Sequence, residues 1–517
     1  MIVLVKNVNH KLRSVCNRFV HVETKEKKIR QWLKPTGYET NIRIHNPITN
    51  CKVPLILKNR NCLTWYMCGP TVYDSAHIGH ALTYVRSDII KRILLHHFNI
   101  NVITAMVITD IDDKIIKRSK EIKQDCQELT KHYETEFVED MNMLNVLKPH
   151  LYCRVTEYIP QIIQFVNNIV NKGNAYATKD GSVYFDTNRY NMYGKLSNPY
   201  QSDTHPDKKS TLDFCLWKGA KSGEPFWESP WGPGRPGWHI ECSTIASTVF
   251  GNSLDIHSGG IDLAFPHHEN EEAQSCVYHE VDQWVNYWIH CGHLVLGDIK
   301  MSKSLQNTIS IREFLKKYTA NHFRILCLSS NYKTEIKFSE EVMLKTECLL
   351  NKIEHFINSC DNYIAGRWSS GNIDEAMLLG TLEEVKSNVD IALADDFNTA
   401  KAMQFLGKLI DTGNKMLYDP CVHLKSRSIP AVAAISNYVS TMLSKFGISH
   451  SREAHDYKMN NLIEHFVKFR RSVRNRAIEQ KDKILLNACD EARSDLSICD
   501  VIIKDMKDET VWSIKKY

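Results

Sequence analysis

Residues 63–80 read LTWYMCGPTVYDSAHIGH, and the order of signals in this stretch decides the fold. An apolar run from Leu63 to Cys68 favours a strand, Gly69-Pro70 ends it, and a helix begins near His77. A second β-rich run, Val102 to Thr109, follows that helix. Because a strand, a helix and a second strand in this order build a parallel nucleotide-binding sheet, we predict an α/β, Rossmann-like domain.

The rest of the chain divides into further stretches. Residues 115–236 are helical and then rich in loops, and strand-like runs resume at residues 254–257 and 287–296. From residue 317 to about residue 460 the pattern is mainly helical. We therefore expect the sheet domain to be split by an insertion and to be followed by a helical portion.

The composition is that of an ordinary globular protein. With 517 residues, 43% of them hydrophobic and 24% charged, the chain is long enough for several buried cores. No apolar run reaches the roughly 18 residues of a membrane helix, so we expect no membrane partner. The 16 cysteines lack the dense spacing of a secreted disulfide scaffold, which indicates mostly free thiols in a reducing compartment.

The N-terminus carries most of the positive charge. Residues 1–34 hold nine Lys/Arg against two acids, a net +7, which leaves −2 for the rest of a chain whose total is +5. A basic, amphipathic N-terminus without early acids is typical of a mitochondrial transit peptide. The alternative is a solvated extension with accidental periodicity. The apolar side chains that recur at helical spacing are Val5, Val8, Leu12, Val15 and Phe19.

Two motifs point to nucleotide chemistry. The stretch His77-Ile78-Gly79-His80 opens a helix, where free N–H groups and the helix dipole favour an anion and the imidazoles can donate hydrogen bonds to phosphate. Some 220 residues later the loop Lys300-Met301-Ser302-Lys303-Ser304 offers ammonium and hydroxyl groups to a triphosphate. Each motif alone is weak evidence for nucleotide binding, because such residues are usually solvated. In this order they resemble the paired signature of class I aminoacyl-tRNA synthetases.

A third constellation offers metal ligands. Cys68, Cys242, His267 and Glu271 supply two thiolates, an imidazole and a carboxylate, a set that suits Zn²⁺. His267 and Glu271 are four residues apart, so on a helix they project from one face. The spacing does not establish the site, because buried cysteines with a surface histidine and glutamate would give the same pattern.

Longer motifs make the chain similar to the cysteinyl-tRNA synthetases, and in particular to compact organellar members. The similarity runs from about Asn41 to the C-terminus, but Gln306 stands where the family usually has glycine, which puts the kinetics of loop closure in doubt. The motifs are CGPTVYD at 68–74, TDIDDK at 109–114, PGRPGWHIEC at 233–242, PHHENE at 266–271 and DDFNT at 395–399.

The resemblance implies roles for individual residues. One zinc ion would be held by Cys68, Cys242, His267 and Glu271, the thiolate of substrate cysteine would bind it, and Trp238 would line the amino-acid pocket. ATP would arrive with Mg²⁺. The residues around the adenylate would be Thr71, Thr83, Thr109, Gly260 and Asp262, and those that handle ATP would be His77, His80, Lys303 and, as a weaker candidate, Lys300.

The resemblance also implies partners and a place of action. We expect a monomer that loads L-cysteine onto tRNA(Cys) in the mitochondrial matrix, with the basic stretch Lys468–Arg476, Phe469 and Trp512 as contacts for tRNA. A solvated helix face explains that stretch equally well. The expected segments are a transit peptide (1–34), the first catalytic half (41–114), a connective insertion (115–236), the second half with the zinc site and lysine loop (237–304), a stem-contact region (305–345), a helical bundle (346–460) and an anticodon-binding domain (461–517).

Three other functions would also use parts of this sequence pattern. A related ligase transfers activated cysteine to an amino sugar, but its relatives lack a full lysine loop and the long C-terminal region. A catalytically silent RNA-binding relative would not need His77, His80 and Lys303. An additional cysteine persulfide synthase activity would use pyridoxal phosphate on Lys114 or Lys117, and a lysine run of this kind is usually solvated.

Overall fold

The computed structural model describes most of the chain after residue 30. The described residues fall into two compact units, one that ends at Ile448 and one that begins at Ser449. No helix in these ranges is long and apolar enough to cross a membrane. The described ranges are 31–199, 206–297, 299–300, 308–366, 373–419, 427–449, 452–499, 501–505 and 510–514.

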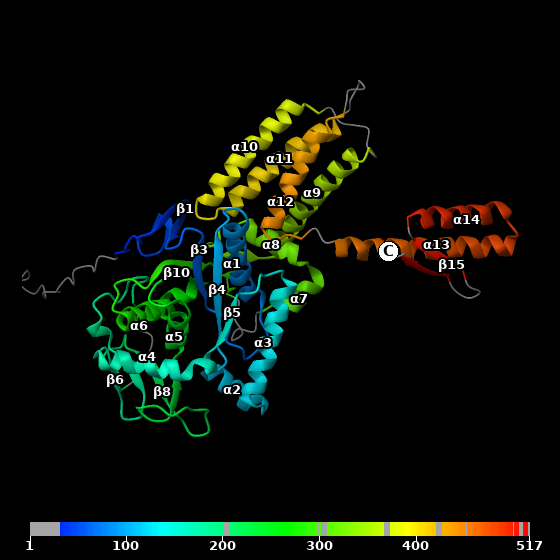
Figure 1. Cartoon of the computed structure of the whole chain (residues 1–517). Helices are drawn as coiled ribbons and strands as arrows, with labels where there is room; N and C mark the ends of the chain where they lie inside the picture. Colours follow the sequence, from blue (N-terminus) through cyan, green and yellow to red (C-terminus); the bar gives the residue numbers. More distant parts are fainter. Residues whose placement is uncertain are drawn as a thin grey trace, which may run out of the picture. The chain divides into compact units, whose positions relative to one another are not determined.

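A five-stranded parallel sheet is the centre of the first unit (Figure 1). Its strand order is β11-β10-β3-β4-β5, and helix α1 (Ile78–His96) connects β3 to β4. The order confirms the predicted α/β, Rossmann-like class. The strands are β3 (Cys62–Met67), β4 (Asn101–Ile108), β5 (Leu151–Arg154), β10 (Leu254–Gly260) and β11 (Val285–Cys291).

The two faces of the sheet belong to different apolar cores. Trp65 and Met67 of β3 pack into the core that contains α1, whereas Tyr66 and Cys68 pack into the other core. This is the alternation that a strand with two covered faces requires. Because β3 lies between β4 and β10, the strand order reverses at β3, and the carboxyl ends of β3 and β10 leave a crevice there.

The segment between β4 and β10 contributes to the main sheet as well as to a smaller one. Strand β5, from within residues 115–236, is the edge strand next to β4. The smaller sheet is antiparallel, in the order β6-β7-β8-β9. The elements are α2 (Asp113–Ile122), α3 (Cys126–Met143), α4 (Ile159–Asn171), β6 (Ala175–Ala177), β7 (Val183–Phe185), β8 (Phe214–Gly219), β9 (Gly234–Pro236) and α5 (Trp238–Phe250).

Further elements flank the sheet and continue into helices. A hairpin, β1–β2, precedes β3, and the helices after β14 pack on one another as the sequence pattern predicts. The elements are β1 (Tyr38–Asn46), β2 (Cys51–Leu57), α6 (Glu269–His279), β12 (Leu294–Leu296), β13 (Ile299–Lys300), α7 (Ile311–Lys317), α8 (Ala320–Leu328), β14 (Ile336–Phe338), α9 (Glu340–Ile364), α10 (Glu375–Ala394), α11 (Thr399–Tyr418) and α12 (Ile429–Lys445).

The second unit pairs two helices with a hairpin. It comprises α13 (Arg452–Gln480), α14 (Lys483–Ile498), β15 (Val501–Asp505) and β16 (Thr510–Ile514). Arg470, which we predicted as a phosphate contact, is 2% exposed and forms two hydrogen bonds to Asp505, at 2.8 and 3.0 Å. Trp512 donates to Glu464 at 2.7 Å and packs against the core of this unit. Arg470 is therefore a structural cation rather than a surface one.

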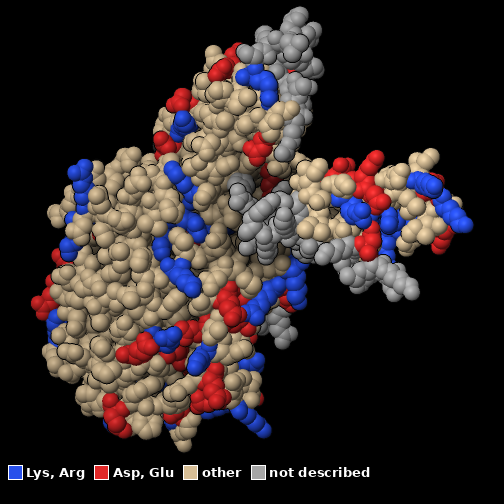
Figure 2. Space-filling view, turned by 45° about the vertical axis from the view of Figure 1, so that its right-hand side comes forward, with Lys and Arg blue, Asp and Glu red and all other residues tan. Residues whose placement is uncertain are grey.

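Charge is mixed on the visible surface. Figure 2 shows Lys/Arg and Asp/Glu interspersed rather than separated into one basic face. This distribution agrees with the net charge of −2 that the sequence leaves for the chain after residue 34. Recognition of a nucleic acid then depends on particular side chains rather than on a general positive field.

Candidate active site and metal centre

A cleft of about 460 Å³ lies where β3 and β10 end. Its walls come from the segment after β3, the first turns of α1, the start of α5 and the end of β10. Residues up to 226 positions apart in the sequence, Cys68 and Leu294, therefore meet in one cavity. Eight of the predicted site residues line it: Cys68, Thr71, His77, His80, Thr83, Trp238, Gly260 and Asp262.

The two histidines of the first motif form the N-terminus of α1. His77 is the N-cap, and its Nδ1 accepts a hydrogen bond from the backbone N–H of Gly79 at 3.1 Å. The His80 ring stacks on the His77 ring, with centroids 3.7 Å apart. Because Nδ1 of His77 accepts, a neutral His77 carries its proton on Nε2, which is the tautomer that can donate to a phosphate oxygen.

The four predicted metal ligands come together behind this cleft. Cys68, Cys242, His267 and Glu271 are all buried, and their ligand atoms lie within 4.8 Å of one another. Cys68 Sγ is 3.9 Å from both Cys242 Sγ and Glu271 Oε1, and His267 Nε2 is 3.0 Å from the same Oε1. Two sulfurs, a nitrogen and an oxygen at these separations fit the tetrahedral donor set of zinc.

Each ligand is held by a different part of the fold. Cys68 follows β3, Cys242 lies on α5 and Glu271 lies in the first turn of α6. His267 lies in a short π-helical turn, Ala264–His268, that runs directly into α6. The pair four residues apart therefore does meet on one helical face.

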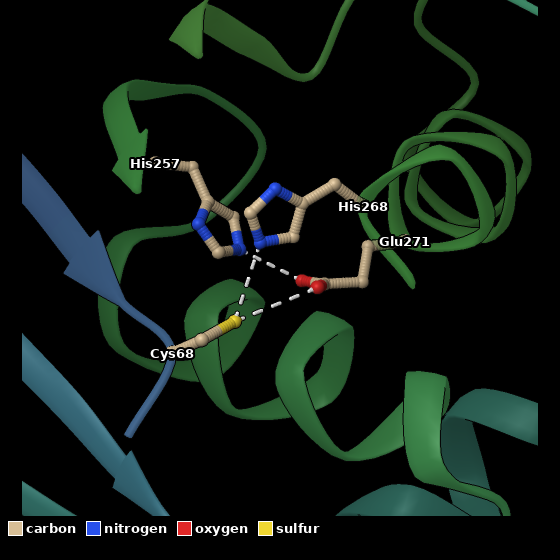
Figure 3. Close-up of side chains that lie close together, drawn as sticks. All are labelled: Cys68, His257, His268 and Glu271. Atoms are coloured by element: carbon tan, nitrogen blue, oxygen red, sulfur yellow. Dashed lines mark hydrogen bonds and ion pairs between the residues drawn. The ribbon is translucent and has the colours of Figure 1, made fainter. Parts of the chain in front are cut away.

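A second donor set shares two of these ligands. Figure 3 shows His257 and His268 converging with Cys68 and Glu271. His268 Nε2 is 3.4 Å from Cys68 Sγ, and His257 Nε2 is 2.8 Å from Glu271 Oε2. Because both sets contain Cys68 and Glu271, they are alternative ligand sets for one ion, not two separate metal sites. Oε1 of Glu271 faces the first set, which leaves Oε2 for the orienting bond to His257.

Burial and charge set the protonation of the ligands. Burial raises the pKa of Cys68 to about 11 and, with the neighbouring sulfur, raises that of Cys242 well above its usual value. Burial opposes ionisation of Glu271 and His267, but attraction to neighbouring groups is stronger. His257 and His267 lower the pKa of Glu271 to about 2, and Glu271 with Cys242 raises that of His267 to about 10. In the metal-free protein both thiols are therefore protonated, and a bound cation would replace protons.

Other buried imidazoles surround the ligands, and the sequence motifs did not predict them. His239 Nδ1 lies 2.8 Å from His267 Nδ1, and His268 Nδ1 lies 2.8 Å from His290 Nε2. Burial lowers the pKa of His239, His268 and His290, so these rings are neutral. A proton on Nδ1 of His267, donated to His239, leaves Nε2 of His267 as the ligand atom. The adjacent His267-His268 pair was the only sequence signal for this cluster.

The remaining predicted residues lie in several places. Trp238 is 39% exposed and stacks on His267, with ring centroids 4.2 Å apart. Thr109 is buried below the cleft, where its backbone N–H donates to Pro70 at 3.1 Å. Lys300 pairs through its backbone in β13, whereas Lys303 and Gln306 lie outside the described residues, as do residues 1–30 of the predicted transit peptide. The remaining residues of that segment are described, and the indole N–H of Trp32 donates to the backbone oxygen of Asn286 at 2.9 Å.

Lysines and aromatic residues at the cleft complete the site. Lys114 lines the cleft, with Nζ 5.9 Å from the centroid of the Tyr73 ring, while Lys117 is exposed and faces Glu121 at 3.9 Å. Tyr133 and Phe137 of α3 also line the cleft and were not predicted. Their spacing of four matches an ordinary apolar helix face, so nothing in the sequence pattern indicates a function for them.

Comparisons with known proteins agree with this geometry. Residues 55–348 match the family model described as the tRNA synthetases class I (C) catalytic domain. The chain is 44% identical to a probable mitochondrial cysteine–tRNA ligase of Xenopus tropicalis, over 93% of this chain and 91% of the relative. It is 37% identical to a cytoplasmic cysteine–tRNA ligase of Dictyostelium discoideum, over 95% of this chain and 80% of the relative.

A solved structure shares the fold. Methionyl-tRNA synthetase of Mycobacterium tuberculosis with methionyl-adenylate superposes with a TM-score of 0.58 at 12% identity, over 74% of this chain and 91% of that structure. Fold, paired motifs and family model together define a class I aminoacyl-tRNA synthetase. Within that class the chain belongs to the cysteine–tRNA ligase family, which confirms the family predicted from the motifs.

Proposed function

We propose that this chain activates L-cysteine with ATP at the cleft, selects it through zinc held by Cys68, Cys242, His267 and Glu271, and transfers it to tRNA(Cys). The observation that carries the proposal is the position of the four buried ligands, directly behind the cleft that α1 opens with His77. Cys68 belongs to both groups, because it is a candidate ligand and also lines the cleft.

The donor set explains selection against serine. Zinc bound there supplies a borderline-soft ion that prefers a thiolate to a hydroxyl. A site that rejects an analogue without its chief ligand discriminates by about 10⁴ or more, whereas a missing methylene gives roughly 10 to 200-fold. Such a site has no need of a separate editing domain. Trp238, stacked on His267, closes the side of the pocket next to the ligands.

Adenylate formation depends on charge and position. The carboxylate of cysteine attacks the α-phosphate of ATP, and pyrophosphate leaves, so the protein has to hold the phosphates without forming a covalent bond. His77 and His80 bind them at the N-terminus of α1, and the lysine loop 300–304 adds positive charge. Thr71, Thr83, Thr109, Gly260 and Asp262 are assigned to the adenylate, and Mg²⁺ accompanies ATP.

We assign tRNA to the helical parts of the chain. The stem-contact region (305–345), the bundle (346–460) and the anticodon-binding unit (461–517) keep their sequence-based boundaries in this proposal. Phe469 on α13 is 66% exposed and beside the exposed Lys468, so it supplies an aromatic face next to a positive charge. Stacking on such a face is a common means of holding an unpaired base.

We also propose that the protein acts in the mitochondrial matrix. The supporting observations are the basic N-terminus and the similarity to a ligase of Xenopus tropicalis whose name specifies the mitochondrion. Residues 1–34 fused to a fluorescent protein should enter mitochondria, and the same segment with its nine Lys/Arg changed to Gln should stay outside. Equal distribution of the two fusions would contradict the assignment.

The first experiment is ATP/pyrophosphate exchange that depends on cysteine. The protein without residues 1–34 is assayed with cysteine or serine, before and after removal of zinc by a chelator. Exchange that requires cysteine, ignores serine and is lost with zinc supports the proposal. Folded, zinc-loaded protein without exchange would contradict it. Charging of tRNA(Cys) against transfer to an amino sugar then separates the two ligase reactions.

A further inference from the structure

The hydroxyl of Tyr66 is a buried polar group at the metal centre. Tyr66 lies on β3, two residues before Cys68, so both side chains lie on the same face of the sheet. The residue is 0% exposed, and within the part of the chain that the structure describes its hydroxyl makes no hydrogen bond of full geometry, although Cys242 lies within side-chain reach of it. A buried polar group without a partner is destabilising, and such groups are uncommon in folded proteins.

The surroundings of this hydroxyl are the candidate ligands. Its ring meets the ring of His257, its neighbour on β10, edge to face, with centroids 5.1 Å apart. The groups that act on the hydroxyl electrostatically are Cys242, Cys68 and Glu271, in that order of strength. A phenol hydroxyl carries its proton at neutral pH and can therefore donate a hydrogen bond.

Cys242 is the acceptor that the geometry favours. Cys68 Sγ already has Cys242, His268 and Glu271 within reach, at 3.9, 3.4 and 3.9 Å. A thiol is a weak acceptor. A metal-bound thiolate is a strong acceptor, because its sulfur carries negative charge. Cys242 would therefore become a strong partner for Tyr66 once it holds the metal as a thiolate.

We propose that Tyr66 is a positioning residue that donates its O–H to the sulfur of Cys242 in the zinc-loaded site. The inference rests on the proposed zinc site and extends it to a residue outside the ligand set. The hydrogen bond fixes the Cys242 side chain and withdraws charge from its sulfur. Less charge then reaches the metal from Cys242, which strengthens its attraction for one further thiolate, that of substrate cysteine.

Tyr66→Phe tests the inference, because it removes the oxygen and keeps the ring. Tyr287→Phe is the matched control: Tyr287 is 1% exposed on β11 of the same sheet, and its hydroxyl bonds the backbone at Ile56 and Pro54 instead. Competition with a chromophoric chelator measures zinc affinity. We expect about 10 to 100-fold weaker binding for Tyr66→Phe, the usual effect of losing an outer hydrogen bond at a metal site. The control should bind zinc as the unchanged protein does.

Two further readouts separate this role from general packing. Without metal, Tyr66→Phe should melt at the same temperature as the unchanged protein or higher, because the lost hydroxyl made no hydrogen bond of full geometry; with zinc, it should gain less stability. In cobalt-substituted protein, the sulfur-to-metal charge-transfer band should shift to lower energy, because the thiolate becomes a stronger donor. Tyr287→Phe should show neither the smaller gain in stability on zinc addition nor the shifted cobalt band.

The outcomes are distinguishable. Weaker zinc binding, a smaller gain on metal addition and the shifted cobalt band support the inference. Equal affinity and an unchanged cobalt spectrum in Tyr66→Phe overturn it, even if activity falls. If the unchanged protein takes up no stoichiometric zinc, the metal site itself is overturned, and the role of Tyr66 with it.

Discussion

Glu271 uses its two oxygens for different neighbours, and this difference favours one of the two candidate donor sets. Oε1 faces Cys68 and His267, whereas Oε2 accepts from His257 at 2.8 Å. In the set we favour, Cys242 binds the metal and His257 only orients the carboxylate. In the other donor set, His257 and His268 take the places of Cys242 and His267 as ligands.

Substitution of Cys242 and of His257 decides between the sets. Cys242→Ala should weaken zinc binding by at least roughly hundredfold, because one of four ligands in a site worth about 10–16 kcal/mol is lost. His257→Asn should cost about 10 to 100-fold, as an outer partner. Zinc content after dialysis and chelator competition measure both. A larger loss for His257→Asn than for Cys242→Ala would favour the second set.

Zinc uptake should depend on pH through the thiols. Burial raises the pKa of Cys68 to about 11, the hydrogen bond with Cys68 and burial raise that of Cys242 well above its usual value, and the pKa of His267 is about 10. At pH 7 both thiols and His267 therefore carry protons that the metal displaces. Apparent affinity should therefore rise with pH, by about tenfold per pH unit for each proton released. Isothermal titration in buffers of different ionisation enthalpy counts these protons. An affinity that is flat between pH 6.5 and 8 would mean that the cysteines are not ligands.

At the level of elements, the sequence predicted what depends on local signals. The change from a strand to a helix around Gly69-Pro70 and His77 predicted β3 and α1, because the turn and the cap are local. Strand β5 was not predicted, because its four residues, Leu151–Arg154, belong to the sheet only through pairing with β4. The candidate site shows the same contrast: motifs predicted the four candidate ligands, but not the position of Tyr66 or His268 beside them, because that position depends on tertiary contacts.

The turn after β3 has no room for a side chain. A Cβ on Gly69 would lie 1.7 Å from the backbone oxygen of Val107, so Gly69→Ala should push β3 away from β4 next to Cys68. We expect a loss of about 2–4 kcal/mol in stability, measured by chemical denaturation, with lower zinc affinity. Gly380→Ala in α10 is the control, because its Cβ would meet open space; it should gain about 0.4–1 kcal/mol. Equal stability of the two variants would contradict this account of the turn.

For the whole molecule, we propose that the two compact units have different parts in the reaction. Local charge predicted a basic surface at residues 468–476, but Arg470 forms its ion pair with Asp505, 35 positions away, which the sequence pattern does not reveal. The division of labour that we propose makes cysteine activation a property of the first unit and recognition of distant parts of tRNA a property of the second.

Substitution of Phe469 tests that division. Phe469→Ala removes an aromatic face worth about 1–3 kcal/mol per stacked base, so kcat/KM for charging of tRNA(Cys) should fall about 5 to 150-fold. Cysteine-dependent ATP/pyrophosphate exchange should not change, because it needs no tRNA. Ile484→Ala on α14 is the control, since Ile484 is 81% exposed and not aromatic. Equal charging of tRNA(Cys) by the two variants would mean that Phe469 does not contact tRNA.

The ligands also join distant parts of one chain. Cys68 is separated by 174 positions from Cys242 and by 203 from Glu271, so an ion shared by them cross-links the two halves of the sheet domain. Like a disulfide across a long loop, such a link restricts the unfolded chain and makes metal binding part of folding. The pool of zinc in the compartment where the chain folds would then limit how many newly made molecules mature. Zinc starvation would reduce cysteine incorporation before it reduced synthesis of the ligase itself.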